Sequence, residues 1–107
     1  MDQKTINQSL RAYLDRLGKS IYIDEALLFG SSISGSRKED SDVDLLILSR
    51  DFSKYDFDTR LKIIYRASTG FPYDLHAYGV TPEEYATASH LTILGAIRSA
   101  NPVAVKK

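Results

Sequence analysis

The sequence predicts an α/β (α+β) fold in which helices flank one mixed central β-sheet. Three observations support this fold class: some stretches have apolar residues at helical spacing, short aliphatic runs have the length of buried strands, and the two patterns alternate along the chain. The chain has 107 residues. That length predicts a single domain over residues 1–107, built around one hydrophobic core.

The first two elements are a helix and a short strand. Over residues 6–17, apolar side chains recur at the spacing of one helix face. The residues on this face are Ile6, Leu10, Tyr13, Leu14 and Leu17. Gly18 then favours the end of the helix. Residues 25–29 form an apolar run that stops before Gly30, and this run predicts a buried strand.

A loop and a second strand follow. Residues 31–41 are small, polar and charged, with Gly35 near their centre, so they predict a loop with room for one helical turn. Residues 43–48 are aliphatic except for Asp44. Such a run predicts a central strand that is covered on both faces.

The remaining elements alternate in the same way. Residues 56–67 have the periodicity of an amphipathic helix. Its expected inward residues are Phe57, Leu61, Ile64 and Tyr65, and its expected outward residues are Arg60, Lys62 and Arg66. Residues 71–80 alternate large side chains after Pro72, which predicts a strand entered through a proline. Residues 91–100 predict a further helix, and residues 102–105 a short terminal strand.

A helix start is clearly recognisable at residues 81–84. Thr81 can cap the helix, Pro82 suits the first helical position, and Glu84 completes a capping box. Glu83 and Glu84 also lie where the helix dipole favours negative charge. We therefore interpret both glutamates as structural rather than catalytic.

Composition and charge argue against several classes of protein. The 14 basic and 14 acidic residues cancel, so charge does not favour nucleic acid as the main partner. The absence of cysteine excludes disulfides and thiolate metal sites. The polar N-terminus lacks the apolar core of a signal peptide, and no apolar run has the length of a membrane span. We therefore expect a cytoplasmic protein with no membrane partner.

Two acidic residues in the aliphatic strand are the first candidates for chemistry. Asp42 and Asp44 are two residues apart, so their side chains leave the same face of a strand. Two ionised carboxylates at one site repel each other, and burial disfavours their charge further. A divalent cation neutralises both, and hard oxygen ligands suit Mg²⁺ or Mn²⁺. The alternative is that Asp42 is a turn residue and Asp44 faces solvent.

Small residues before this acidic pair indicate a phosphate-binding loop. Gly30 and Ser31 end the preceding strand, and ten residues lie between Ser31 and Asp42. A glycine lets backbone N–H groups approach a phosphate, and a short helix after it would point its positive end at the anion. Ser31 or Ser32 can donate a hydroxyl hydrogen bond to phosphate oxygens. Gly-Ser alone is common in turns, so this prediction depends on its spacing from the two aspartates.

A third carboxylate, Asp74, lies among apolar residues of a later predicted strand. A charged group in such a segment needs a partner or a metal. If this strand lies beside that of Asp42 and Asp44, three carboxylates converge at one sheet edge, as two-metal phosphoryl transfer requires. His76 lies on the same predicted face and could contact nucleotide or acceptor. The alternatives are a solvent-facing Asp74 and a packed or partly exposed His76.

In these motifs the chain resembles the DNA polymerase β-like nucleotidyltransferase superfamily. The matching signature is Leu-Phe-Gly-Ser at residues 28–31, followed after ten residues by Asp-Val-Asp-Leu-Leu-Ile at residues 42–47. Asp-Leu-His-Ala-Tyr at residues 74–78 and Thr-Pro-Glu-Glu at residues 81–84 are similar to the third-acid strand and the next helix of its small branch, the minimal nucleotidyltransferases. The resemblance implies the palm-like fold of that superfamily, with all three active-site acids in place.

The resemblance also implies a role for each candidate. Asp42 and Asp44 would hold two Mg²⁺ ions against the triphosphate of the donor, for which ATP is the usual choice in the family. Asp74 would bind the catalytic ion and orient or deprotonate the acceptor hydroxyl.

The same resemblance implies a nucleotide-binding set in the loop. Gly30 and Ser31, with Ser32, would bind the β- and γ-phosphates. Arg37 or Lys38 would offset charge on the pyrophosphate leaving group; the alternative is that both belong to a solvated surface loop.

Proteins of the small branch resemble the antitoxin of a toxin–antitoxin pair whose toxin is an all-helical HEPN-domain ribonuclease. The resemblance implies transfer of AMP from ATP to a tyrosine hydroxyl of that toxin. Larger relatives carry a second, helical domain, so a homo-oligomer or a separate polypeptide is expected to complete the pocket here. Two alternatives stay open: a small-molecule nucleotidyltransferase of the aminoglycoside-modifying kind, and a non-catalytic module that neutralises its partner by contact alone.

Overall fold

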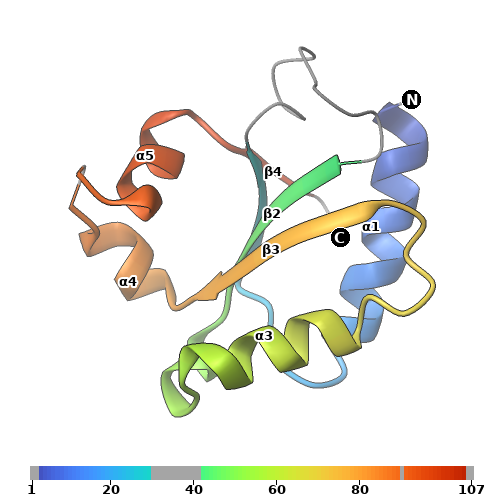
Figure 1. Cartoon of the computed structure of the whole chain (residues 1–107), viewed down its shortest axis with the longest axis horizontal. Coiled ribbons are helices and arrows are strands. Elements are labelled where there is room, and N and C mark those ends of the chain that lie inside the picture. The colour runs from blue at the N-terminus through green and yellow to red at the C-terminus, as the bar shows by residue number, and fades with distance from the viewer. Residues whose placement is uncertain (1–2, 30–41, 90, 106–107) are drawn as a thin grey trace.

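A computed structural model describes residues 3–29, 42–89 and 91–105 of the chain (Figure 1). It contains a four-stranded mixed sheet flanked by helices, so the predicted fold class is confirmed. The elements in chain order are helix α1 (Gln3–Leu17), strands β1 (Glu25–Phe29) and β2 (Asp42–Leu48), the 3₁₀ helix η1 (Arg50–Lys54), helix α3 (Phe57–Arg66), strand β3 (Asp74–Val80), helices α4 (Pro82–Thr87) and α5 (Ile93–Ser99), and strand β4 (Val103–Ala104).

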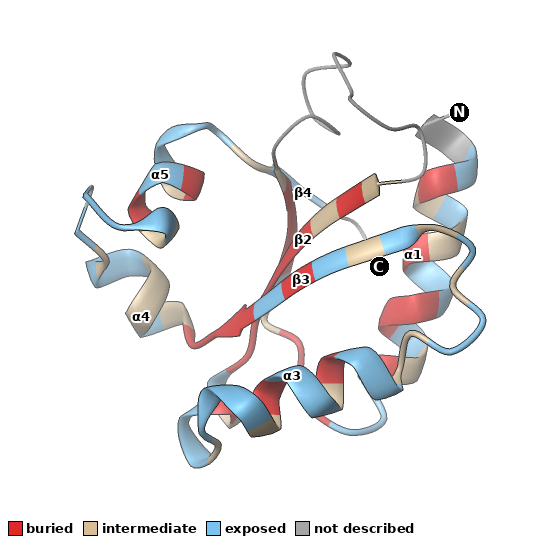
Figure 2. Cartoon of the chain, in the orientation of Figure 1, coloured by how far each residue is buried: buried red, intermediate tan, exposed pale blue. Residues whose placement is uncertain are grey.

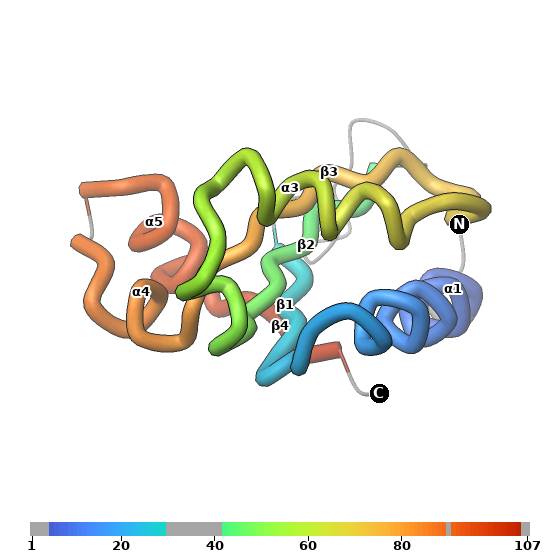
Figure 3. Tube along the Cα trace, turned by 90° about the horizontal axis from the view of Figure 1, so that it is seen from below, coloured from blue at the N-terminus to red at the C-terminus, as the bar shows by residue number. Residues whose placement is uncertain are grey.

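The sheet has the strand order β3-β2-β1-β4, which places β2 between two neighbours. β1 is antiparallel to both β2 and β4, whereas β2 and β3 are parallel. The sheet lies between α1 on one side and the α4–α5 pair on the other, as the two perpendicular views show (Figures 1 and 3). The aliphatic run of β2 is therefore covered on both faces, as predicted.

Alternate residues of β2 enter two separate cores. Val43, Leu45 and Ile47 pack with the residues of α1, whereas Leu46 and Leu48 pack with Val80 of β3 and Ile97 of α5. Colouring by burial shows the inner part of the sheet as its most continuously buried part (Figure 2). Such two-sided burial explains why β2 is aliphatic at consecutive positions rather than at alternate ones.

Helix α1 covers one face of the sheet as its periodicity predicts. All five expected inward residues are buried, and Gly18 follows directly after the last residue of the helix. The hydroxyl of Tyr13 donates a 2.8 Å hydrogen bond to the carbonyl of Ile64, so its one polar group is satisfied inside the core. Burial raises the pKa of Tyr13, which therefore remains protonated and keeps this hydrogen bond.

The prediction for the faces of α3 was partly wrong. Ile64 is buried as expected, but Phe57 is 64% exposed, and Leu61 and Tyr65 are also exposed. Conversely, Arg60, which was expected to face solvent, is only 5% exposed. The helix is therefore rotated relative to the position that its apolar residues alone indicate, and a charged side chain occupies part of its inner face.

The surroundings of Arg60 explain why a cation is buried there. Its guanidinium donates hydrogen bonds to the carbonyls of Tyr55 (3.0 Å) and Gly79 (3.2 Å). It also forms a two-pronged ion pair with the Glu84 carboxylate, at 2.8 and 3.2 Å. The ring of Phe57 lies over the guanidinium carbon at 4.6 Å. These groups replace the water molecules that the guanidinium loses, so they offset the free-energy cost of burying the charge of Arg60.

Strand β3 begins three residues later than expected, at Asp74 rather than Phe71. The backbone N–H of Phe71 donates to the Ser68 carbonyl (2.9 Å), which closes a turn before the strand. The Phe71 ring packs 5.7 Å from that of Tyr13 and 5.6 Å from that of Tyr73. These aromatic residues therefore belong to a cluster at the entrance of the strand rather than to its ladder.

The predicted capping box of α4 is confirmed. Thr81 Oγ1 accepts a hydrogen bond from the Glu84 N–H (3.0 Å), and Glu84 Oε1 accepts one from the Thr81 N–H (2.8 Å). The pKa of Glu84 lies below its usual range, first because of its hydrogen bond with Arg60. Glu84 is thus structural, as interpreted from the sequence, and it links α4 to α3.

The observed bounds of α5 and β4 lie within two residues of the bounds that the sequence predicted. Helix α5 starts at Ile93 and β4 spans Val103–Ala104, inside the expected ranges. The 3₁₀ helix η1 was not predicted; it begins after Ser49, whose hydroxyl accepts a hydrogen bond from the Asp51 N–H (3.1 Å). Within the described ranges, no helix combines the length and the hydropathy that crossing a membrane requires.

The close packing at Gly79 gives the first prediction. A Cβ at this position would lie 2.6 Å from Cε2 of Phe52 and 2.8 Å from Cδ1 of Ile64, and both of these side chains are fully buried. We expect Gly79→Ala to lower the free energy of unfolding by about 1–3 kcal/mol, measured by urea denaturation. Combining it with Phe52→Leu should cost less than the sum of the two single changes, because the smaller side chain leaves room for the methyl group. Strict additivity would contradict this packing.

The Arg60–Glu84 ion pair gives the second prediction. Glu84→Gln should lower the free energy of unfolding by about 1–2 kcal/mol at neutral pH, less than for a fully buried pair because Glu84 is 40% exposed. A lowered pKa in the folded state means that the charged form stabilises the fold above the ordinary glutamate pKa, and that this stability is lost as pH falls through the lowered value. The difference between wild type and variant should therefore shrink on acidification. Glu83→Gln, exposed on the same helical turn, is the matched control.

Candidate active site

The acidic residues predicted from the sequence lie together on one face of the sheet. Because β2 and β3 are parallel neighbours, Asp42 is the register partner of Asp74, and Asp44 is the partner of His76. Side chains of register partners leave the same face, and neighbouring strands lie about 4.8 Å apart. The predicted condition for convergence of the three carboxylates, that their two strands lie side by side, is thus confirmed. Their metal-binding role stays a prediction.

The face that carries these residues also carries α4 and α5. Leu46 and Leu48 continue the alternation of Asp42 and Asp44 along β2, and these two leucines contribute to the core beneath α5. The acids therefore lie at the start of β2, beyond the end of that core. On this face of β2, the side chains change from charged at Asp44 to aliphatic at Leu46, two residues later.

The three carboxylates differ in exposure. Asp42 and Asp44 are partly buried, whereas Asp74 is exposed. Asp42 is the first residue of β2, but its side chain is only 26% exposed, so it is no freely solvated turn residue. Asp74 is accessible enough to approach a group that comes from solvent, which suits a residue that handles an acceptor.

His76 lies beside the acids, on the face that the sequence predicted. Its Nε2 is 3.7 Å from Oδ1 of Asp42, and its side chain is 55% exposed. The contact is an ion pair only when the imidazole is protonated. His76 is therefore a partly exposed residue at the rim of the acidic cluster, where it can contact a bound molecule.

The donor chemistry of this cluster suits a divalent cation. The Cα atoms of alternate residues of β2 are about 6.6 Å apart along the strand, and that of Asp74 is one strand spacing away, so the three carboxylates can reach a common ion by rotation of their side chains. In the ranges that the structure describes, no three acidic or histidine side chains already form a closed ligand group. The chemistry of these residues fits Mg²⁺.

Two aromatic residues that sequence reasoning did not assign lie next to the acids. Phe29 is the register partner of Asp44 on β1, and its ring lies 6.4 Å from that of Tyr78 on β3. The two rings meet across β2, between the acids and the apolar core. They form an apolar border on which a bound base or side chain could pack. The signal in the sequence was the alternation of Asp74, His76 and Tyr78, which places all three on one face.

The predicted phosphate-binding residues lie outside the described residues. These are Gly30, Ser31, Ser32, Arg37 and the alternative Lys38. The first described range ends at Phe29, directly before Gly30, and Phe29 pairs with Asp44. The chain therefore leaves β1 beside the acidic cluster, while the phosphate-binding role of the five residues stays a prediction.

Comparison with protein families matches residues 8–95 to the nucleotidyltransferase domain. Comparisons with curated proteins and with solved structures gave no significant match. The matched segment covers most of the chain and contains α3, all three acids and the helix start at Thr81. The chain belongs to the nucleotidyltransferase domain family.

Proposed function

We propose that this nucleotidyltransferase is Mg²⁺-dependent and transfers AMP from ATP to a tyrosine hydroxyl of a HEPN-domain partner, as the antitoxin of a toxin–antitoxin pair. The observation that carries the metal-dependent part is the register of β2 and β3. It brings Asp74 opposite Asp42, one strand spacing away and beside Asp44. Membership of the family supports the transfer of a nucleoside monophosphate in general.

The three acids divide two tasks between them in this reaction. Asp42 and Asp44 are partly buried at the start of the central strand β2, so they would hold the metal ions that bind the triphosphate end of the donor. Mg²⁺ supplies charge neutralisation and Lewis-acid polarisation of the phosphate oxygens when it is bound. Asp74 lies on the sheet-edge strand β3 and is exposed, so it meets the acceptor.

The reaction is a single displacement at phosphorus. The acceptor oxygen forms a bond to the α-phosphorus of ATP, and the bond between that phosphorus and the bridging oxygen of the β-phosphate breaks. Pyrophosphate leaves with the electron pair of the broken bond. Asp74 orients the acceptor hydroxyl and takes its proton as the new bond forms. The products are the AMP ester of the acceptor and pyrophosphate.

The accessibility of the acidic cluster supports a macromolecular acceptor. Asp74 and His76 are both exposed and lie on an edge strand, where a hydroxyl on another polypeptide can reach them. Among the described residues, α4 and α5 cover the same sheet face only over its far end. A partner protein that approaches the acidic end can therefore complete the pocket.

The direct test is transfer to the helical protein encoded beside this chain. The purified chain is incubated with ATP labelled at the α-phosphate, with Mg²⁺ and with that protein, and the protein label is measured. We expect label on a tyrosine and loss of the partner's ribonuclease activity. Tight binding without label would instead favour a module that acts by contact alone. Label on an aminoglycoside hydroxyl, with none on protein, would favour the small-molecule enzyme.

Removing one metal-binding charge tests the assignment of the acids. Asp42→Asn or Asp44→Asn should reduce transfer by at least about 100-fold, because each removes a ligand whose ion contributes several kcal/mol to the transition state. The free energy of unfolding should not fall, since each change relieves repulsion in a crowded cluster. Asp15→Asn, an exposed change on α1, is the control for loss of a carboxylate elsewhere. Unchanged transfer in both cluster variants would rule out the metal assignment.

A further inference from the structure

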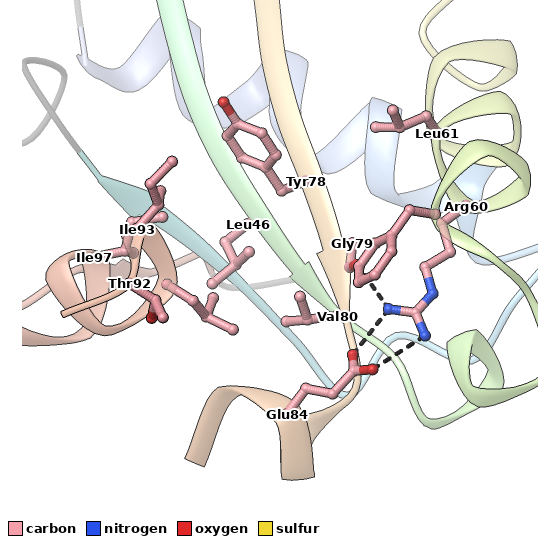
Figure 4. Close-up of a pocket in the computed structure, with 12 residues that line it drawn as sticks. Leu46, Arg60, Leu61, Tyr78, Gly79, Val80, Glu84, Thr92, Ile93 and Ile97 are labelled. Carbon is pink, nitrogen blue, oxygen red and sulfur yellow. Dashed lines mark hydrogen bonds and ion pairs between the residues drawn. The ribbon is translucent and has the colours of Figure 1, made fainter. Parts of the chain in front are cut away.

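A pocket of about 430 Å³ lies on the face that carries the acids, between α3 and the α4–α5 pair (Figure 4). Its floor is formed by Leu46 of β2 and by Tyr78 and Val80 of β3. Its volume lies within the range of sites that hold a small ligand or a large side chain. Nothing in the proposed reaction accounts for it.

The walls of this pocket are apolar, and three of their residues, Phe57, Leu61 and Ile93, are exposed. Phe57 and Leu61 line it from α3, and Ile93 and Ile97 line it from α5. Phe57 is 64% exposed and Ile93 is 75% exposed, whereas aliphatic and aromatic side chains of this size normally lose most of their exposure on folding. Four exposed apolar or aromatic side chains, Phe57, Leu61, Tyr78 and Ile93, line this one hollow, and such a cluster is typical of a binding surface.

The polar side chains of Arg60, Glu84 and Thr92 in the lining already have partners within the chain, and the half-exposed Tyr78 adds a single hydroxyl. Glu84, the one carboxylate among the described lining residues, is paired with Arg60, and Arg60 also donates to backbone carbonyls. The Thr92 hydroxyl accepts from the Gly95 N–H (3.1 Å) and donates to the Ser89 carbonyl (2.6 Å). A polycationic aminoglycoside would need uncommitted carboxylates, and a nucleobase edge would need uncommitted donors and acceptors. The chemistry therefore favours an apolar occupant.

The pocket lies next to the acidic cluster on the same face of the sheet. Leu46 follows Asp44 by two residues on β2, and Tyr78 follows His76 by two residues on β3, on the same face. Two residues of strand span about 6.6 Å. An occupant of the pocket is thus two to four residues of extended polypeptide away from a hydroxyl placed at the acids.

We propose that this pocket binds a large apolar side chain of a polypeptide acceptor, two to four residues away from the hydroxyl that receives the nucleotide. This inference rests on the proposed transfer to a protein, and it adds a sequence preference for the acceptor. The apolar side chain anchors the acceptor, and the extended segment between anchor and hydroxyl leads along β3 to Asp74. The pocket thereby selects polypeptides over aminoglycosides.

The test is a binding measurement that needs no catalysis. Methyl chemical shifts of the isotope-labelled full chain are recorded during titration with two capped peptides, Gly-Gly-Tyr-Gly-Leu-Gly-Gly and Gly-Gly-Tyr-Gly-Ser-Gly-Gly. The first should shift the methyl groups of Leu46, Ile93 and Ile97, and it should bind about tenfold more tightly than the second, because it buries one leucine side chain. Equal affinity for both peptides, or shifts confined to other methyl groups, would overturn the proposal.

Two variants test whether the leucine peptide binds in the pocket. Ile93→Ser should weaken binding of the leucine peptide about fivefold to tenfold. Because Ile93 is exposed, the change should leave the fold intact, which the methyl spectrum checks directly. Val103→Ser is the matched control: Val103 is also exposed, but it pairs with Leu28 and therefore lies on the opposite face from Leu46. Equal weakening by both variants would contradict the pocket as the site.

Three further titrations cover the competing occupants. Kanamycin, ATP with Mg²⁺, and increasing concentration of the chain itself should each leave the methyl groups of Ile93 and Ile97 unshifted; Leu46 is left out of this comparison because it lies two residues from Asp44. A shift of the α5 methyl groups would assign the pocket to an aminoglycoside, a nucleobase or a second copy and overturn the proposal. The result is independent of the transfer assay. Peptide binding without transfer would refute the proposed reaction alone, and transfer without a preference for leucine would refute the anchor alone.

Discussion

The pairing of β2 with β3 is the constraint on which the rest of the molecule depends. β2 is the buried centre of the sheet and also carries two carboxylates, and these demands conflict because burial disfavours charge. β2 places its charged and its buried apolar residues at different ends of one face: Asp42 and Asp44 come first, and Leu46 and Leu48 follow. A slip of one residue would turn both acids into the core beneath α1. The same pairing places Asp74 opposite Asp42, so one register fixes the core and the acidic cluster together.

Helix α3 protects the edge strand on which that register depends. The hydroxyl of Tyr65 accepts a hydrogen bond from the Ala77 N–H (3.0 Å), and Arg60 donates to the Gly79 carbonyl. Two backbone groups at the outer edge of β3 are therefore occupied by side chains of the same helix, which blocks pairing with another strand there. Arg60 also reaches Glu84, so the ion pair ties α3, β3 and α4 into one unit. That unit forms one wall and part of the floor of the apolar pocket.

Sequence patterns predicted those features that depend on one element and failed where several elements meet. The face of α1 and the two-sided burial of β2 follow from apolar periodicity alone, and the facing of Asp42 and Asp44 follows from the two-residue repeat of a strand. Periodicity could not place Arg60 inside, because its burial depends on acceptors from residues 19 and 24 positions away along the chain. The pocket was invisible for the same reason, since its lining comes from β2, β3, α3, α4 and α5.

The charged and apolar halves of one sheet face suggest how binding energy could serve the reaction. Contacts made only near the acids would have to bind and orient the acceptor hydroxyl at once, in a cluster whose carboxylates repel one another without a cation. An anchor in the pocket separates these tasks: burial of an apolar side chain supplies affinity, and the short segment leading to Asp74 restricts where the hydroxyl can lie. The intervening Phe29–Tyr78 contact keeps the two halves distinct, with the apolar core on one side and the acids on the other. Under this proposal, specificity for a polypeptide comes from the pocket, whereas the chemistry comes from the carboxylates.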